Sequence, residues 1–146
     1  MISLVAAACA SPAQRFTERV AALGLGTEMV AGTLFQHMVF RRARGASRTL
    51  HVYLDGDGTP WHLGRPTADP TPRDPLVLEL MALDARPSLY LGRPCYHGLA
   101  SEPPCASALW TEARYSEGVV ASLAAALRRI RDRGGVARVV WFGHSG

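Results

Sequence analysis

The sequence predicts an α/β protein with a mostly parallel β-sheet and helices on both faces of that sheet. Three observations support this class. Apolar residues make up 48% of the 146-residue chain, which is enough for a folded core. From residue 49 onward, short apolar strand patterns alternate with helical patterns. Glycine and proline residues mark the boundaries between these segments.

The N-terminal part contains one predicted helix and two predicted strands. A serine cap followed by proline predicts a helix over residues 12–23, which a pair of glycines ends. Residues 33–40 have the character of a strand. A basic loop over residues 41–48 then leads to a second strand at residues 49–54.

The C-terminal part continues the alternation of strands and helices. A Gly/Pro/Asp-rich loop covers residues 55–74, and Asp74 is expected to cap a helix that runs to about residue 83. A short strand follows at residues 88–91. A long helix over residues 111–133 and a strand over residues 137–142 complete the series.

Both of these later helices have apolar residues on one face. In the shorter helix, Leu76, Leu80 and Leu83 share a face. In the longer helix the stripe consists of Val119, Leu123, Ala126, Leu127 and Ile130. We expect these faces to contact the sheet.

The last strand runs into Gly143-His144-Ser145-Gly146. These are four of the five residues of Gly-x-Ser-x-Gly, the nucleophile elbow in which a sharp turn after a strand exposes a serine hydroxyl. The pattern predicts Ser145 as a catalytic nucleophile, with Gly143 allowing the tight turn. His144 is expected to pack or to support the site rather than to act as the base. The alternative is an ordinary turn after a strand.

An oxyanion hole requires two backbone N–H groups, one from the residue after the nucleophile and one from the loop after an earlier strand. Gly146 would supply the first. The loop after residues 49–54 is in the right place for the second, and its Asp57 is the predicted donor. Gly56 and Gly58 flank Asp57 and would let the backbone approach a ligand closely.

The same loop supports a different hypothesis. Residues 52–59 match the pattern hhhDxDGT, the first motif of haloacid-dehalogenase-type phosphatases. In that family the first aspartate, here Asp55, attacks phosphate, and the second, here Asp57, is a general acid. Both also help to hold magnesium. The chain has no lysine and no acidic residue after Asp132, which disfavours this alternative. We otherwise predict neither a metal nor a cofactor.

Five longer segments carry a resemblance to a known family. They read LHVYLDGDGTPW, DPTPRDPL, LYLGRPCYHG, LWTEARYSEGVVASLAAAL and VVWFGHSG. Together, over roughly residues 30–146, they resemble a bacterial family of α/β-hydrolase-fold proteins that are often predicted lipoproteins. The resemblance implies an esterase- or lipase-like serine hydrolase with Ser145 as nucleophile, whose Asp/Glu and His lie later in the chain.

This sequence departs from that family by ending at the elbow. We therefore expect an incomplete α/β-hydrolase fold, with residues 11–146 as the N-terminal portion of one domain. Such a truncated chain would be inactive alone, although the complete form would hydrolyse a small-molecule or lipid ester. A non-catalytic gene fragment is the alternative. Residues 1–10 are predicted to be the remnant of a signal or lipobox-like segment.

The cysteine residues are relevant to the cellular compartment in which the protein is located. Cys9 follows an apolar N-terminal run and would be a lipidation site, as in bacterial lipoproteins; a plain apolar N-terminus is the alternative. Cys95 and Cys105 flank a Pro/Gly-rich stretch and would form a disulfide in an exported protein, or remain free thiols in a reducing compartment. We predict an exported, periplasmic or lipid-anchored protein of a bacterial envelope.

The charge pattern argues against nucleic acid as a partner. The net charge is +4, and all 16 basic residues are arginines. These arginines are scattered, and no aromatic interleaving or known binding motif accompanies them. Contact with a membrane is expected only through a lipid anchor at Cys9.

Overall fold

The structure is a computed structural model that describes residues 10–42, 45 and 47–145. The helices in this part of the chain are α1 (Pro12–Ala22), α2 (Leu76–Leu83) and α3 (Glu117–Arg133), with a short 3₁₀ helix at Ser107–Trp110. The strands are β1 (Gly26–Ala31), β2 (Gln36–Arg41), β3 (Thr49–Leu54), β4 (Trp61–His62), β5 (Arg65–Pro66), β6 (Ser88–Leu91) and β7 (Arg138–Gly143).

Five of these strands form one sheet in the order β1-β2-β6-β3-β7. β3 pairs in parallel with both β6 and β7, whereas β2 pairs antiparallel with β1 and β6. The predicted α/β class is therefore confirmed, but the sheet is mixed rather than mostly parallel. The short connection between β1 and β2 accounts for one of the two antiparallel pairs, because a hairpin can join only antiparallel strands. β4 and β5 form a separate small hairpin.

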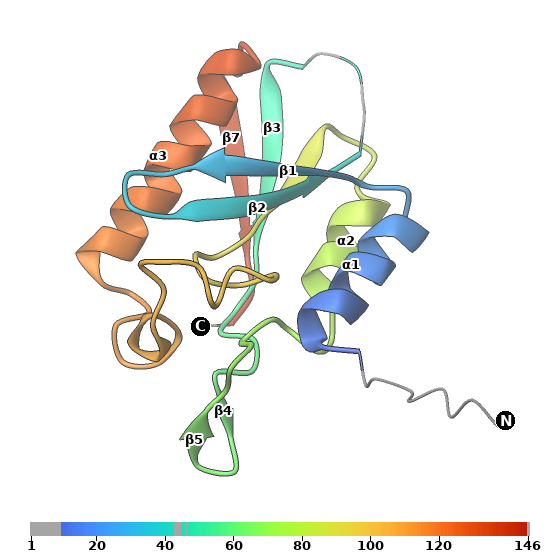
Figure 1. Cartoon of the computed structure of the whole chain (residues 1–146). Coiled ribbons are helices and arrows are strands. Elements are labelled where there is room, and N and C mark those ends of the chain that lie inside the picture. The colour runs from blue at the N-terminus through green and yellow to red at the C-terminus, as the bar shows by residue number, and fades with distance from the viewer. Residues whose placement is uncertain (1–9, 43–44, 46, 146) are drawn as a thin grey trace, which may run out of the picture.

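Helices cover both faces of the sheet (Figure 1). One core cluster joins α1 and α2 to β2, β3 and β6, and includes Phe16, Val20, Phe40, Tyr53, Leu78 and Tyr90. A second cluster joins α3 to the opposite face, and includes Val39, Val52, Leu89, Leu91, Ala126 and Ile130. Alternate residues of each strand thus enter different cores, as the pleat of a strand requires.

Several predicted elements differ from the structure. β1 was not predicted, because only one of its six residues is buried and it lacks an alternating apolar pattern. β2 begins at Gln36 instead of residue 33, and α3 begins at Glu117 after turns that replace the first part of the predicted helix. β3 spans the predicted residues 49–54, and Gly134 caps α3 as expected.

The orientation of α2 contradicts the prediction. Leu76, Leu80 and Leu83 are 43%, 48% and 81% exposed, whereas Leu78 and Met81 are buried. Nearly every residue of α2 is apolar, so the sequence pattern could not identify the inward face. Asp74 does not cap the helix either, since the N-cap position is occupied by Pro75 and no side chain bonds there.

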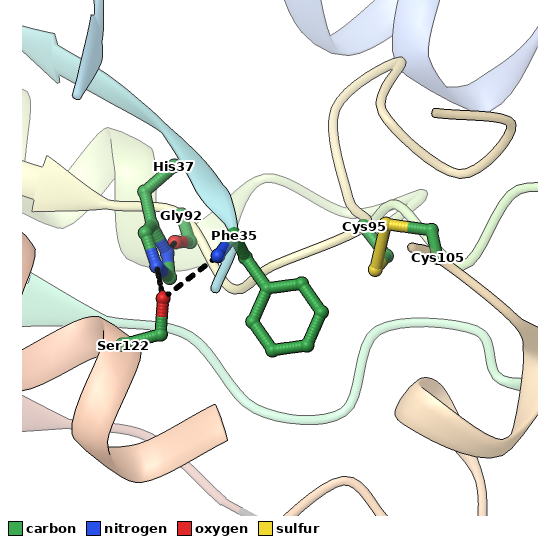
Figure 2. Close-up of a disulfide and its surroundings, with 6 residues drawn as sticks. All are labelled: Phe35, His37, Gly92, Cys95, Cys105 and Ser122. Carbon is green, nitrogen blue, oxygen red and sulfur yellow. Dashed lines mark hydrogen bonds between the residues drawn. A yellow bond between two sulfur atoms is a disulfide. The ribbon is translucent and has the colours of Figure 1, made fainter. Parts of the chain in front are cut away.

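A third cluster lies under the cysteine loop and contains the disulfide between Cys95 and Cys105 (Figure 2). Beside it, the ring of His37 is fully buried, with its Nδ1 3.0 Å from the Gly92 carbonyl oxygen and its Nε2 2.9 Å from the Ser122 hydroxyl. The Ser122 hydroxyl also accepts a bond from the Phe35 N–H. These contacts fix the β1–β2 turn against α3.

The disulfide is expected to make a measurable contribution to stability. Replacing both Cys95 and Cys105 by alanine should lower the free energy of unfolding by about 3 kcal/mol in the chain-entropy model, because the bond restricts the unfolded chain. Urea unfolding under oxidising conditions measures this loss, with Cys9→Ala as the control. A loss below about 1 kcal/mol would contradict the expectation.

In the described part of the chain, no helix combines the length and the apolar character needed to cross a membrane. The predicted lipidation site Cys9 and the predicted oxyanion donor Gly146 lie outside the described residues.

Candidate functional site

The carboxyl ends of β3 and β7 lie side by side at one edge of the sheet. Their parallel register pairs Leu54 with Gly143, so the loop after β3 meets the residues after β7. The His144 N–H donates to the Leu54 carbonyl at 3.1 Å. A Cβ on residue 56 would overlap the Ser145 carbonyl oxygen, so only glycine permits this close approach of the two backbones.

A hollow of about 400 Å³ opens where these two chain segments meet. It is lined by residues 55–59, 72–74 and 144–145. Ser145 is exposed at its rim, and its hydroxyl makes no hydrogen bond within the described part of the chain. The backbone N–H of Asp57 likewise has no acceptor among the described residues. The structure therefore brings the predicted nucleophile and the loop of the predicted oxyanion donor to one hollow.

Asp55 links this hollow to the core. Its carboxylate accepts bonds from the Gly56 N–H at 2.8 Å and from the Tyr90 hydroxyl at 3.2 Å. Burial raises the pKa of Asp55, and these bonds offset only part of that rise. Burial and the nearby Asp55 also raise the pKa of Tyr90, so the Tyr90 hydroxyl keeps its proton and donates.

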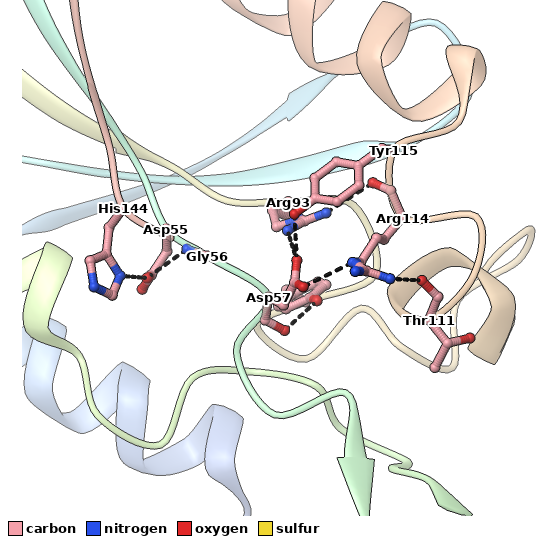
Figure 3. A network of polar contacts seen from close by, with 9 residues as sticks. Asp55, Gly56, Asp57, Arg93, Thr111, Arg114, Tyr115 and His144 are labelled. Carbon is pink, nitrogen blue, oxygen red and sulfur yellow. Dashed lines mark hydrogen bonds and ion pairs between the residues drawn. The ribbon is translucent and has the colours of Figure 1, made fainter. Parts of the chain in front are cut away.

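Asp57 is held by side chains from two other segments (Figure 3). Its carboxylate forms ion pairs with Arg93 at 2.7 Å and with Arg114 at 2.8 Å. The Tyr115 hydroxyl donates to the same carboxylate at 2.9 Å, and the Tyr96 hydroxyl donates to the Asp57 carbonyl at 2.8 Å. Below, these four partners of Asp57 are called the Asp57 clamp.

The glycines and His144 have different surroundings. Gly58 has a φ of +63°, and a Cβ there would overlap the Pro70 carbonyl oxygen, so a glycine is required. At Gly143, by contrast, an added Cβ meets no described atom within 4 Å. The side chain of His144 is exposed, and its Nδ1 lies 3.7 Å from Asp55 Oδ1. It contacts the site residue Asp55 rather than the core.

Sequence reasoning missed most of the polar partners in this site. The sequence did not predict that Tyr90, Arg93, Tyr96 and Arg114 contact Asp55 or Asp57. Tyr90, Arg93, Tyr96 and Tyr115 lie 35 to 58 positions from the aspartate that each contacts, so no local spacing could reveal them. His97 is also buried, and its Nε2 lies 3.4 Å from the Tyr90 hydroxyl.

The phosphatase hypothesis requires Asp55 and Asp57 to hold magnesium, and their surroundings do not fit that ion. Both oxygens of Asp57 are occupied by guanidinium groups, which would repel a divalent cation. Asp55 is turned toward Tyr90 and the Gly56 N–H. Among the described residues, no group of three or more His, Cys, Asp or Glu side chains is placed to bind a metal.

Comparison with known proteins gives no relative for this chain. No protein-family model matches it, and neither a curated protein nor a solved structure is similar to it at a significant level. The function must therefore be inferred from the chemistry of the site itself.

Proposed function

We propose that this chain contains the nucleophile and the oxyanion loop of a serine hydrolase with an α/β-hydrolase fold. The observation that carries the proposal is the shared hollow, in which Ser145 follows one strand and Asp57 follows the neighbouring parallel strand. In this fold the nucleophile follows a strand, and one oxyanion donor comes from the loop after the third strand. Residues 55–75 are that loop here, since they connect β3 to α2.

The proposed reaction is acyl transfer from an ester-type substrate to water. A histidine takes the proton from Ser145, whose oxygen attacks the substrate carbonyl carbon. The carbonyl oxygen becomes an oxyanion, which the backbone N–H groups of Asp57 and Gly146 stabilise. The alcohol then leaves with the proton, and water releases the acid by the same steps in reverse order.

A base for Ser145 is not found in the described part of the chain. His144 is the neighbouring residue, but its Nδ1 is directed to Asp55. We therefore propose that the base and its acidic partner are not among the described residues. The 146-residue chain alone would show negligible turnover, because an oxyanion hole without a base leaves only residual catalysis.

The disulfide supports the proposed location. A bond between Cys95 and Cys105 persists in oxidising compartments such as the bacterial periplasm or the extracellular space. We propose export to the cell envelope, with lipidation at Cys9 as the means of anchoring. The substrate would then be a small-molecule or lipid ester.

The proposal predicts a selective reaction of Ser145 when a base is supplied. A fluorophosphonate probe should label the 146-residue chain slowly, and added imidazole should raise labelling at Ser145 at least about tenfold by acting as the missing base. Mass spectrometry of tryptic peptides identifies the labelled serine. Ser145→Ala should abolish this labelling, whereas Ser101→Ala, which removes an exposed serine, should not change it.

Two outcomes would contradict parts of the proposal. Labelling spread evenly over the exposed serines, with no effect of imidazole, would show that Ser145 is not a nucleophile. Labelling of Ser145 at the rate of an ordinary serine hydrolase without imidazole would show that the chain already contains a base.

A further inference from the structure

The Asp57 clamp holds a segment in which glycines flank Asp57 on both sides. Asp57 lies between two glycines, which restrict the backbone least of all residues. The clamp contacts this segment at the Asp57 carboxylate and at the Asp57 carbonyl. A residue held at its carboxylate and at its carbonyl by four side chains has little freedom to move its Cα, so the position of its backbone nitrogen is restricted as well.

Arg93 is the central member of the clamp. Its guanidinium donates to Asp57 Oδ1 at 2.7 Å and to the Arg114 carbonyl at 2.9 Å, so it joins two loops. Its Cζ lies 5.1 Å from the centre of the Tyr115 ring and 5.7 Å from that of Tyr96. The residue is 7% exposed. A lysine could not make both bonds in one plane, because its ammonium group lacks the fork of the guanidinium.

The charge of the clamp also suits an oxyanion. Alone, the Asp57 carboxylate would repel a negative charge that develops at its own backbone N–H. Two guanidinium groups against one carboxylate leave the cluster with a net positive charge. Donors for an oxyanion act well only when they are already oriented, about 2.7–3.1 Å from its position.

We infer that Arg93, together with Arg114 and Tyr96, positions the backbone N–H of Asp57 toward the hollow that contains Ser145. Arg93 is thus a positioning residue, because it acts through Asp57 and does not line this hollow. The inference rests on the proposed function, since it assigns the held N–H to the oxyanion of that reaction.

The test is the mobility of the Asp57 amide in the 146-residue chain, measured by ¹⁵N relaxation. In the unchanged chain its order parameter should be about 0.85, the value of rigid backbone. In Arg93→Ala it should fall below about 0.6, while the amide of Val52 in β3 stays rigid. Arg93→Lys should restore part of the loss, and Tyr96→Phe should loosen the loop by removing one hydroxyl.

Two control variants separate positioning from general stability. Arg133→Ala removes an arginine from an exposed ion pair with Glu28 and should leave Asp57 rigid. Leu78→Ala removes a buried side chain from a core cluster that contains no member of the clamp, and should lower stability without loosening Asp57. If Arg93→Ala does not fold, Arg93→Lys and Tyr96→Phe decide the question.

The inference is wrong if Asp57 stays rigid in the variants of Arg93 and Tyr96, or if Leu78→Ala loosens it equally. This measurement does not depend on the reactivity of Ser145. If Asp57 becomes mobile in Arg93→Ala but Ser145 is not labelled by the probe, the positioning role of the clamp is supported and the proposed hydrolase function is wrong. If Ser145 is labelled selectively but Asp57 stays rigid in every variant, the hydrolase function is supported and the positioning role of the clamp is wrong.

Discussion

Lowering the pH from 6.5 to about 4.5 is expected to reduce the free energy of unfolding by roughly 2 kcal/mol through His97 alone. Burial lowers the pKa of this imidazole from 6.5 to about 3, and the negative charge of Asp69 opposes that shift only weakly. The ring is packed against Phe16 and Phe40, so a proton on it would place a charge among aromatic side chains.

The sign of this change in stability follows from whether the folded or the unfolded chain binds the proton first. Below pH 6.5 the unfolded chain protonates His97, whereas the folded chain does not until the pH approaches about 3. The unfolded state therefore gains protons first, and stability is lost as the pH falls through this window. Burial also lowers the pKa of His37, which adds a loss of the same sign.

Urea unfolding at several pH values measures the effect. His97→Asn should reduce the slope of stability against pH by roughly 1 kcal/mol per pH unit between pH 6 and pH 4.5. Asparagine tolerates the positive φ of 57° at this position. His62→Asn, at an exposed position in β4, is the matched control and should keep the original slope. An unchanged slope in His97→Asn would refute the assignment.

Asp57→Ala is expected to destabilise the protein by about 3 kcal/mol, because it leaves the buried guanidinium of Arg93 without its counter-charge. Glu28→Ala is the matched control. Glu28 also pairs with two arginines, Arg41 and Arg133, but their side chains are 51% and 59% exposed. Exposed pairs contribute only about 0–1 kcal/mol. Equal losses in the two variants, measured by urea unfolding, would contradict the special role of the buried pair.

The sequence predicted most of the elements from residue 49 onward. In that region apolar patterns, capping residues and glycines agree with one another, so β3, β6, α3 and β7 were found within a few residues of their true limits except at the start of α3. The sequence did not predict β1, because an edge strand with exposed side chains has no apolar alternation. The inward face of α2 was predicted wrongly, because a uniformly apolar helix has no apolar periodicity that would identify it.

The site could be predicted only where its chemistry is local. The run Gly143-His144-Ser145 and the segment Gly56-Asp57-Gly58 each stand out in the sequence because they follow strands. Their meeting also follows from the alternation of strands and helices, since parallel strands end at the same edge. The Asp57 clamp could not be predicted, because its contacts join segments that only the folded chain brings together.

Arg93 and Tyr96 lie on either side of Cys95, which is bonded to Cys105. The sulfur bridge therefore anchors the segment from which two members of the Asp57 clamp reach the loop beside Ser145. Reducing agents would therefore act on the site indirectly. Reduction of the disulfide would loosen the segment that holds Asp57, without any contact between the reducing agent and the hollow. On this view the redox state of the surroundings sets how well the hollow is ordered, and thiol-free buffers are a condition for observing its chemistry.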